Sequence, residues 1–346
     1  MATIVIHAGM HKTGSTSIQR WIADNHERLR DQHDIQVLVA ANRTRRNPTD
    51  EVRFEPYESG DVNSSRWIRG LVDAQQPAAV RRLVADLSTF ANHSANLLIS
   101  AELLSRMFWQ LDDAFLRSLE ELARDHEVRV AYYVRPQHGA IESLWRDSGF
   151  KHLELQASEW VRKQTRQLRY LRVLDSLQEL APSVGLGVRP FVPELLDGGN
   201  PVEDFVRRFL LLEERCDDVR ANPGLPLSLV NVLRHAPTGW FWTWSEDRPI
   251  DTPWRGRVGT LLDGSEIQES ARIRRSRAIL QSYCHDVFES ENQELIRRLG
   301  WPLEHFVPPT ELDVGWSLGE LDDLWTPEAS EAERALLYQV LRAALA

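Results

Sequence analysis

Short apolar runs alternate with longer amphipathic stretches along the first two thirds of the chain. Runs at positions 4–6, 35–40, 96–100, 128–134 and 185–192 are rich in branched or aromatic residues, as buried strands are. Between and after them, apolar residues recur at helical spacing over 77–90, 113–124, 158–180 and 202–212. This alternation predicts a three-layer α/β fold with a central, mostly parallel sheet of about five strands.

The remaining stretches carry a different pattern. Positions 42–65 are polar and without periodicity, which predicts a lid, a binding loop or a disordered segment. The second half favours a helical C-terminal lobe, with a last amphipathic helix at 328–345. We therefore expect an α/β core over 1–235, a lobe rich in tryptophan and helix over 236–300, and an extension over 301–346.

The first strand runs directly into a loop and a helix. Gly9 and Gly14 give this loop a permissive backbone, and apolar residues at 18, 21 and 22 mark the helix that follows. The unpaired N–H groups and the positive dipole end of a helix N-terminus favour an anion. Hydroxyl groups add donors there, from Thr13, Ser15, Thr16 and Ser17. The loop therefore predicts a phosphate site.

The position of the lysine distinguishes this loop from the nucleotide-triphosphate loop. In G-x-x-x-x-G-K-[ST] the lysine follows the second glycine, whereas Ser15 stands there in this chain and Lys12 lies inside the loop. Only Lys12, Lys151 and Lys163 are lysines among 41 basic residues, so a compact ammonium is used here in a chain that otherwise prefers arginine.

The sequence His-Lys-Thr-Gly-Ser-Thr-Ser at 11–17 resembles the 5′-phosphosulfate loop of sulfotransferases that use 3′-phosphoadenosine-5′-phosphosulfate (PAPS), in the bacterial branch related to carbohydrate sulfotransferases. The resemblance implies a P-loop-type fold. It also implies that Lys12 neutralises the leaving group, that residues 13–17 hold the 5′-phosphate, and that His11 could touch the bridging region. The alternative interpretation is a strand-to-helix turn that is merely rich in Gly, Ser and Thr.

Glu102 follows the expected strand at 96–100. The carboxyl ends of parallel strands share one edge of the sheet, so Glu102 is expected beside the Lys12 loop, where it could take a proton from an acceptor hydroxyl. Related sulfotransferases place a Glu in a Ser-x-Glu at this strand end and use it as the base, although other branches use His. Alternatively, Glu102 only stabilises the start of the next helix.

Arg135 ends the expected strand at 128–134, and Ser143 follows eight residues later on a helix. A guanidinium fork and a hydroxyl two turns on can converge on one anion. This pair resembles the 3′-phosphate motif of the sulfotransferases, and the 3′-phosphate separates PAPS from ATP. The alternative for Arg135 alone is a surface ion pair.

Composition limits the remaining function classes. A net charge of −10 disfavours non-specific binding to nucleic acid. No secretory signal or membrane span is visible, so the cytoplasm is the expected location. Cys216 and Cys284 have no metal spacing and are expected to be buried thiols, and the mechanism implied by the resemblance needs no metal.

The acceptor is the least determined partner. Tryptophans at 240, 242, 244 and 254 could stack on the sugar rings of a glycan acceptor, or could pack an irregular lobe. The tail could dock on the same domain or on a second subunit of a homodimer. Two other functions stay open: a kinase of a small molecule, disfavoured by Ser15, and a catalytically silent nucleotide-binding protein.

Overall fold

The computed structural model describes residues 1–10, 12–42, 52–64, 77–93, 96–102, 113–149, 154–216, 271–306 and 316–325, with the single positions 104, 230, 335 and 339. The chain forms two compact units. The first contains Met1–Pro136 and Arg169–Ala221, and the second contains Gln137–Leu168 and Asn222–Ala346. The division expected at 235 and 300 stays a prediction, because much of the chain around these positions lies outside the described residues.

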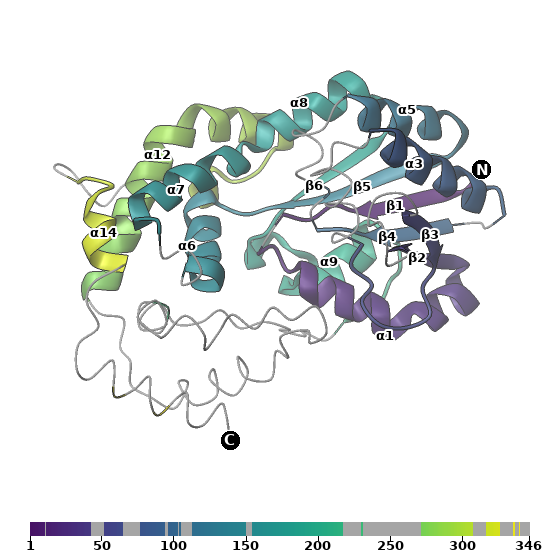
Figure 1. The fold of residues 1–346 in the computed structure, drawn as a ribbon, viewed down its shortest axis with the longest axis horizontal. Helices are drawn as coiled ribbons and strands as arrows, with labels where there is room; N and C mark the ends of the chain where they lie inside the picture. Colours follow the sequence, from purple (N-terminus) through teal and green to yellow (C-terminus); the bar gives the residue numbers. More distant parts are fainter. Residues whose placement is uncertain are drawn as a thin grey trace. The chain divides into compact units, whose positions relative to one another are not determined.

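The first unit is built on one six-stranded sheet in the order β3-β2-β4-β1-β5-β6 (Figure 1). The strands are β1 Thr3–His7, β2 Ile35–Asn42, β3 Val52–Pro56, β4 Asn96–Ser100, β5 Glu127–Val134 and β6 Gly185–Pro190. All neighbours pair in parallel except β2 and β3, which are antiparallel. The expected α/β class and the mostly parallel sheet are confirmed, although the sheet has six strands rather than about five.

Helices cover both faces of this sheet (Figure 1). The helices α1 Ser15–His33 and α9 Pro201–Arg208 contact each other on one face, and α3 Pro77–Ala91, α5 Ala114–Asp125 and α8 Tyr170–Leu180 lie on the other. On the α1 face, Ile18 and Ile22 pack into a core that includes Phe205 of α9. Burial of this apolar face fixes where α1 begins relative to the strand ends.

The order of the strands places a topological switch point at β1 and β4. In β1, His7 pairs with Ser100 of β4 on one side and with Ala131 of β5 on the other. The helix after β1 lies on one face of the sheet, and α5, which follows β4, lies on the opposite face. Ligands of open α/β sheets bind beyond the carboxyl ends of the strands at such a switch point.

Two sequence predictions were wrong in detail. The stretch 42–65 contains β3, in which buried Val52 and Phe54 alternate with exposed Arg53, a pattern too short to stand out in a polar segment. The expected helix at 158–180 is broken into α7 Ala157–Thr165, a 3₁₀ turn at Arg166–Leu168, and α8. Arg169 has non-helical φ and ψ of −83° and 78°, so the helix cannot continue through it.

The described elements of the second unit are all helical: α6 Gln137–Ser148, α7, the 3₁₀ turn, α12 Ala271–Leu299, α13 Leu303–Phe306 and α14 Glu320–Trp325. Trp145 lies at the centre of their core, edge-on to Trp160 at 5.1 Å and stacked on Trp325 at 5.0 Å between ring centroids. Asp322 accepts hydrogen bonds from the Ser158 N–H and hydroxyl at 2.7 and 2.8 Å, which fixes α14 to the start of α7. Among the described helices of the chain, none has the length and apolar content to span a bilayer.

Candidate anion site at the carboxyl edge of the sheet

The loop between β1 and α1 has an unusual backbone. Lys12 has a φ of 67° and Gly14 a φ of 77°, both in the left-handed region. A non-glycine residue rarely adopts this conformation, and such strain concentrates at ligand sites. Gly14 is the N-cap of α1 and has no side chain with which to cap the helix, and the first turn contains no acidic residue. The positive end of α1 therefore favours an external anion.

Side chains inside the loop hold its shape. The buried Thr13 hydroxyl donates to the Met10 carbonyl at 2.6 Å, and the buried Ser15 hydroxyl makes a longer bond of 3.4 Å to the same oxygen. Thr16 is exposed and Ser17 half-buried, and both lie in the first turn of α1. The five predicted residues at 13–17 are thus together, but the Thr13 hydroxyl is used within the loop.

Arg135 reaches the loop from β5. Its Nη1 donates to the Lys12 carbonyl at 3.1 Å, and its guanidinium carbon lies 5.7 Å from the centre of the Phe191 ring. The backbone carbonyl of Arg135 accepts from the Tyr170 hydroxyl at 2.6 Å. The structure therefore brings the Arg135 guanidinium to the backbone of Lys12 in the loop.

Gly14 is required by close packing as well as by its φ. A Cβ added there would lie 2.6 Å from Pro201 Cγ and 2.9 Å from Phe191 Cε2. Pro201 begins α9, whose N-cap Asn200 accepts from the N–H groups of Val202 and Glu203. The beginning of α9 and the residue after β6 thus form a wall against which the loop is seated.

Glu102 lies two residues beyond β4 and is half-buried. The preceding Ala101 N–H donates to the His7 carbonyl at 2.9 Å, which holds the end of β4 against the end of β1. Burial lowers the pKa of His7 to about 4, and the Glu102 carboxylate offsets part of that fall, so the two groups interact electrostatically.

A second segment reaches this edge that the sequence did not place there. Ser64 donates its N–H to the Ser100 carbonyl at 2.9 Å, and its hydroxyl accepts from Ala40 N–H at the same distance. Asn63 forms a parallel bridge with Ser100. The end of the expected loop at 42–65 therefore lies beside the carboxyl end of β4, and no sequence motif marks that return.

The remaining predicted site residues lie in the second unit or outside the described residues. Ser143 is half-buried on α6 in the second unit, and its role in the 3′-phosphate site stays a prediction. His11 lies outside the described residues, as do the four tryptophans at 240–254 and Lys151. Cys216 and Cys284 are buried free thiols. Within the described ranges, no cluster of three His, Cys, Asp or Glu side chains suits a metal ion.

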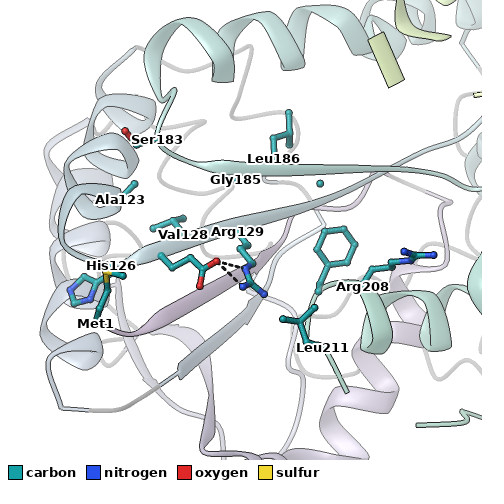
Figure 2. Close-up of a pocket in the computed structure, with 13 residues that line it drawn as sticks. Met1, Ala123, His126, Val128, Arg129, Ser183, Gly185, Leu186, Arg208 and Leu211 are labelled. Carbon is teal, nitrogen blue, oxygen red and sulfur yellow. Dashed lines mark hydrogen bonds and ion pairs between the residues drawn. The ribbon is translucent and has the colours of Figure 1, made fainter. Parts of the chain in front are cut away.

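A hollow of about 630 Å³ lies at the opposite edge of the sheet, at the amino ends of β5 and β6 (Figure 2). Arg129 lies on its wall and donates through Nε to Glu127 at 2.8 Å, and the glycines at 185 and 187 contribute backbone. None of the predicted site residues lines it. This hollow is therefore separate from the residues that the sequence predicted for the anion site.

Comparisons of the chain with family models, with curated proteins and with solved structures find no match.

Proposed function

We propose that this protein transfers a sulfuryl group from PAPS to an acceptor hydroxyl, and that its sheet and loop form a P-loop-type fold. The observation that carries the proposal is the N-terminus of α1, where the N-cap is a glycine, preceded by Lys12 in a left-handed conformation with Arg135 bonded to its carbonyl. These groups suit a ligand with more than one anionic group.

The donor fits the available groups in charge and in hydrogen bonding. The first-turn N–H groups of α1 and the hydroxyls of Ser15, Thr16 and Ser17 would hold the 5′-phosphate. Arg135 would bind the 3′-phosphate, with Ser143 as its expected partner. To do so, Arg135 would exchange its bond to a neutral carbonyl for one to a charged oxygen, which is roughly twice as strong.

The residues then have distinct roles in the transfer. Glu102 takes the proton of the acceptor hydroxyl as the acceptor oxygen forms its bond to sulfur. The bond between sulfur and the bridging oxygen breaks, and its electron pair stays on the phosphate of adenosine 3′,5′-bisphosphate. Lys12 stabilises the negative charge that develops on that oxygen. After the transfer, the sulfuryl group is on the acceptor oxygen, the proton is on Glu102, and the electron pair is on the bisphosphate.

The acceptor class is the least constrained part of the proposal. A carbohydrate or glycoconjugate hydroxyl is implied by the resemblance of residues 11–17. The segment ending at Asn63 and Ser64, which lies beside Ser100, is the described part of the chain best situated to contact an acceptor near Glu102.

Nucleotide binding tests the proposal without knowledge of the acceptor. Calorimetric titration should show that the wild type binds adenosine 3′,5′-bisphosphate at least about tenfold more tightly than 5′-AMP, because a hydrogen-bonded charge pair adds roughly 1.5–3 kcal/mol. Arg135→Ala should remove that preference. Arg129→Ala, which changes an arginine at the other end of β5, should keep it.

Two results would contradict the proposal. Equal affinity of the wild type for both nucleotides would remove the role of Arg135. Tighter binding of ATP with Mg²⁺ than of the bisphosphate would favour a kinase instead.

A further inference from the structure

His7 carries a polar atom that is buried without a hydrogen bond. Its side chain is 0% exposed, and Nδ1 lies 2.9 Å from Ser100 Oγ, whereas Nε2 has no partner within the described part of the chain. An unpaired buried polar atom costs free energy, so such atoms are uncommon in folded proteins. This points to a partner that joins Nε2 when the site is occupied.

Gly9 shows where Nε2 lies relative to the loop. A Cβ added to Gly9 would lie 2.9 Å from His7 Nε2 and 2.5 Å from Ser15 Oγ. The ring nitrogen and the hydroxyl therefore border the same small space on the inner side of the loop. A side chain at position 9 would collide with both atoms, so glycine is what lets them lie this close to the loop backbone.

Ser15 is poised between two hydrogen-bonding arrangements. Its hydroxyl is at the start of α1 and now donates to the Met10 carbonyl over a long 3.4 Å. A carbonyl can only accept, so this bond uses the single proton of Ser15. Ser15 can donate to an anion only when that proton leaves Met10, and its oxygen can then accept from a neighbouring N–H.

We propose that His7 is a positioning residue for the anion site: its Nε2–H donates to Ser15 Oγ, so that the Ser15 hydroxyl donates to the bound anion. The tautomer this requires has Nδ1 as the acceptor of the Ser100 hydroxyl proton. The inference rests on the anion-binding part of the proposed function and is independent of the transfer step.

The surroundings of His7 favour a neutral ring. Only a neutral imidazole can donate through Nε2 and accept through Nδ1 at the same time. Tyr133 and Phe205 pack edge-on against it, with ring centroids at 6.3 and 5.3 Å. Burial lowers the pKa of His7 to about 4, and Glu102 is the charged group that opposes this shift. Near neutral pH the ring therefore carries a single proton, on either Nδ1 or Nε2. The hydrogen bonds around the ring decide which nitrogen carries it.

A matched pair of variants separates the two ring nitrogens. His7→Gln places an amide near the position of Nε2, whereas His7→Asn places one near the position of Nδ1. His7→Asn and Ser15→Ala should each weaken adenosine 3′,5′-bisphosphate binding about tenfold, since each removes one link to a charged ligand. The affinity of His7→Gln for the bisphosphate should stay within about threefold of the wild type. The double variant, His7→Asn with Ser15→Ala, should bind the bisphosphate no more weakly than Ser15→Ala alone.

If His7→Asn and His7→Gln lose equal affinity for the bisphosphate while their melting temperatures are equal, the inference is overturned. Additive losses of affinity in the double variant would overturn it as well. A second measurement needs no variant. The ¹⁵N spectrum of the wild-type His7 ring should show the Nε2-protonated tautomer in the complex with adenosine 3′,5′-bisphosphate, and the Nδ1-protonated tautomer would overturn the inference. Failure of the wild type to bind the bisphosphate would contradict the proposed function as well, whereas failure of the variant pattern alone would contradict only the role of His7.

Discussion

Replacing Gly14 with alanine tests how closely the loop between β1 and α1 packs against Pro201 and Phe191. Gly14 has a φ of 77°, and an added Cβ would lie 2.6 Å from Pro201 Cγ and 2.9 Å from Phe191 Cε2. The left-handed conformation costs an alanine roughly 1–2 kcal/mol, and forcing a methyl group into a packed site costs typically about 1–3 kcal/mol more. Gly14→Ala should therefore lower the free energy of unfolding by about 2–5 kcal/mol and weaken bisphosphate binding.

Gly199 provides the matched control. Its φ of 74° is nearly the same, but an added Cβ would meet only the Pro193 carbonyl at 3.9 Å, an ordinary contact. Gly199→Ala should cost only the conformational term of roughly 1–2 kcal/mol. Urea denaturation followed by circular dichroism compares the two variants. If Gly14→Ala is no less stable than Gly199→Ala, the close packing of Gly14 against α9 and Phe191 is refuted.

Three further changes test other parts of the molecule. Lys12→Ala should abolish sulfuryl transfer but leave bisphosphate affinity within a few-fold, since the proposed role of Lys12 is to stabilise charge that develops during transfer. Lys163→Ala, which changes an exposed lysine, should alter neither the transfer nor the affinity. The buried Asp204 accepts hydrogen bonds from the Tyr133 hydroxyl at 2.7 Å, from Arg189 Nε at 3.0 Å and from Asp197 N–H at 3.0 Å. Asp204→Ala should therefore lower the free energy of unfolding, measured by urea denaturation, by about 3–5 kcal/mol. A loss under about 1 kcal/mol would contradict this prediction. His7 has a pKa of about 4 when folded and 6.5 when unfolded, so the unfolded state binds the proton first as pH falls. Stability should drop by up to about 3 kcal/mol between pH 6.5 and pH 4 in the wild type and by less in His7→Gln; equal slopes would contradict it.

The sequence allowed the strand ends to be located, and with them the positions of Lys12, Glu102 and Arg135. Apolar runs identify buried strands because consecutive residues on β1, β4 and β5 all face packed layers. Parallel pairing then brings their carboxyl ends to one edge. These elements could be predicted because local pattern and tertiary burial agree.

The contacts within the site could not be predicted, because they depend on packing between distant segments. Nothing in the residues around Thr13 indicates that its hydroxyl closes the loop on Met10, or that Arg135 reaches the Lys12 carbonyl. Asn63 and Ser64 return to Ser100 through a segment whose polar composition is typical of a loop. The unpaired Nε2 of His7 follows only from the geometry around Ser100 and Gly9.

A structure of the protein in complex with adenosine 3′,5′-bisphosphate would test the proposed function most directly. The 5′-phosphate should lie at the N-terminus of α1, within hydrogen-bond distance of the first-turn N–H groups, and the 3′-phosphate should lie on the guanidinium of Arg135. Glu102 should face the space next to Lys12. A nucleotide bound in the hollow at the amino ends of β5 and β6, or bound at α1 with its 3′-phosphate away from Arg135, would contradict the assignment of this protein as a PAPS-dependent sulfotransferase.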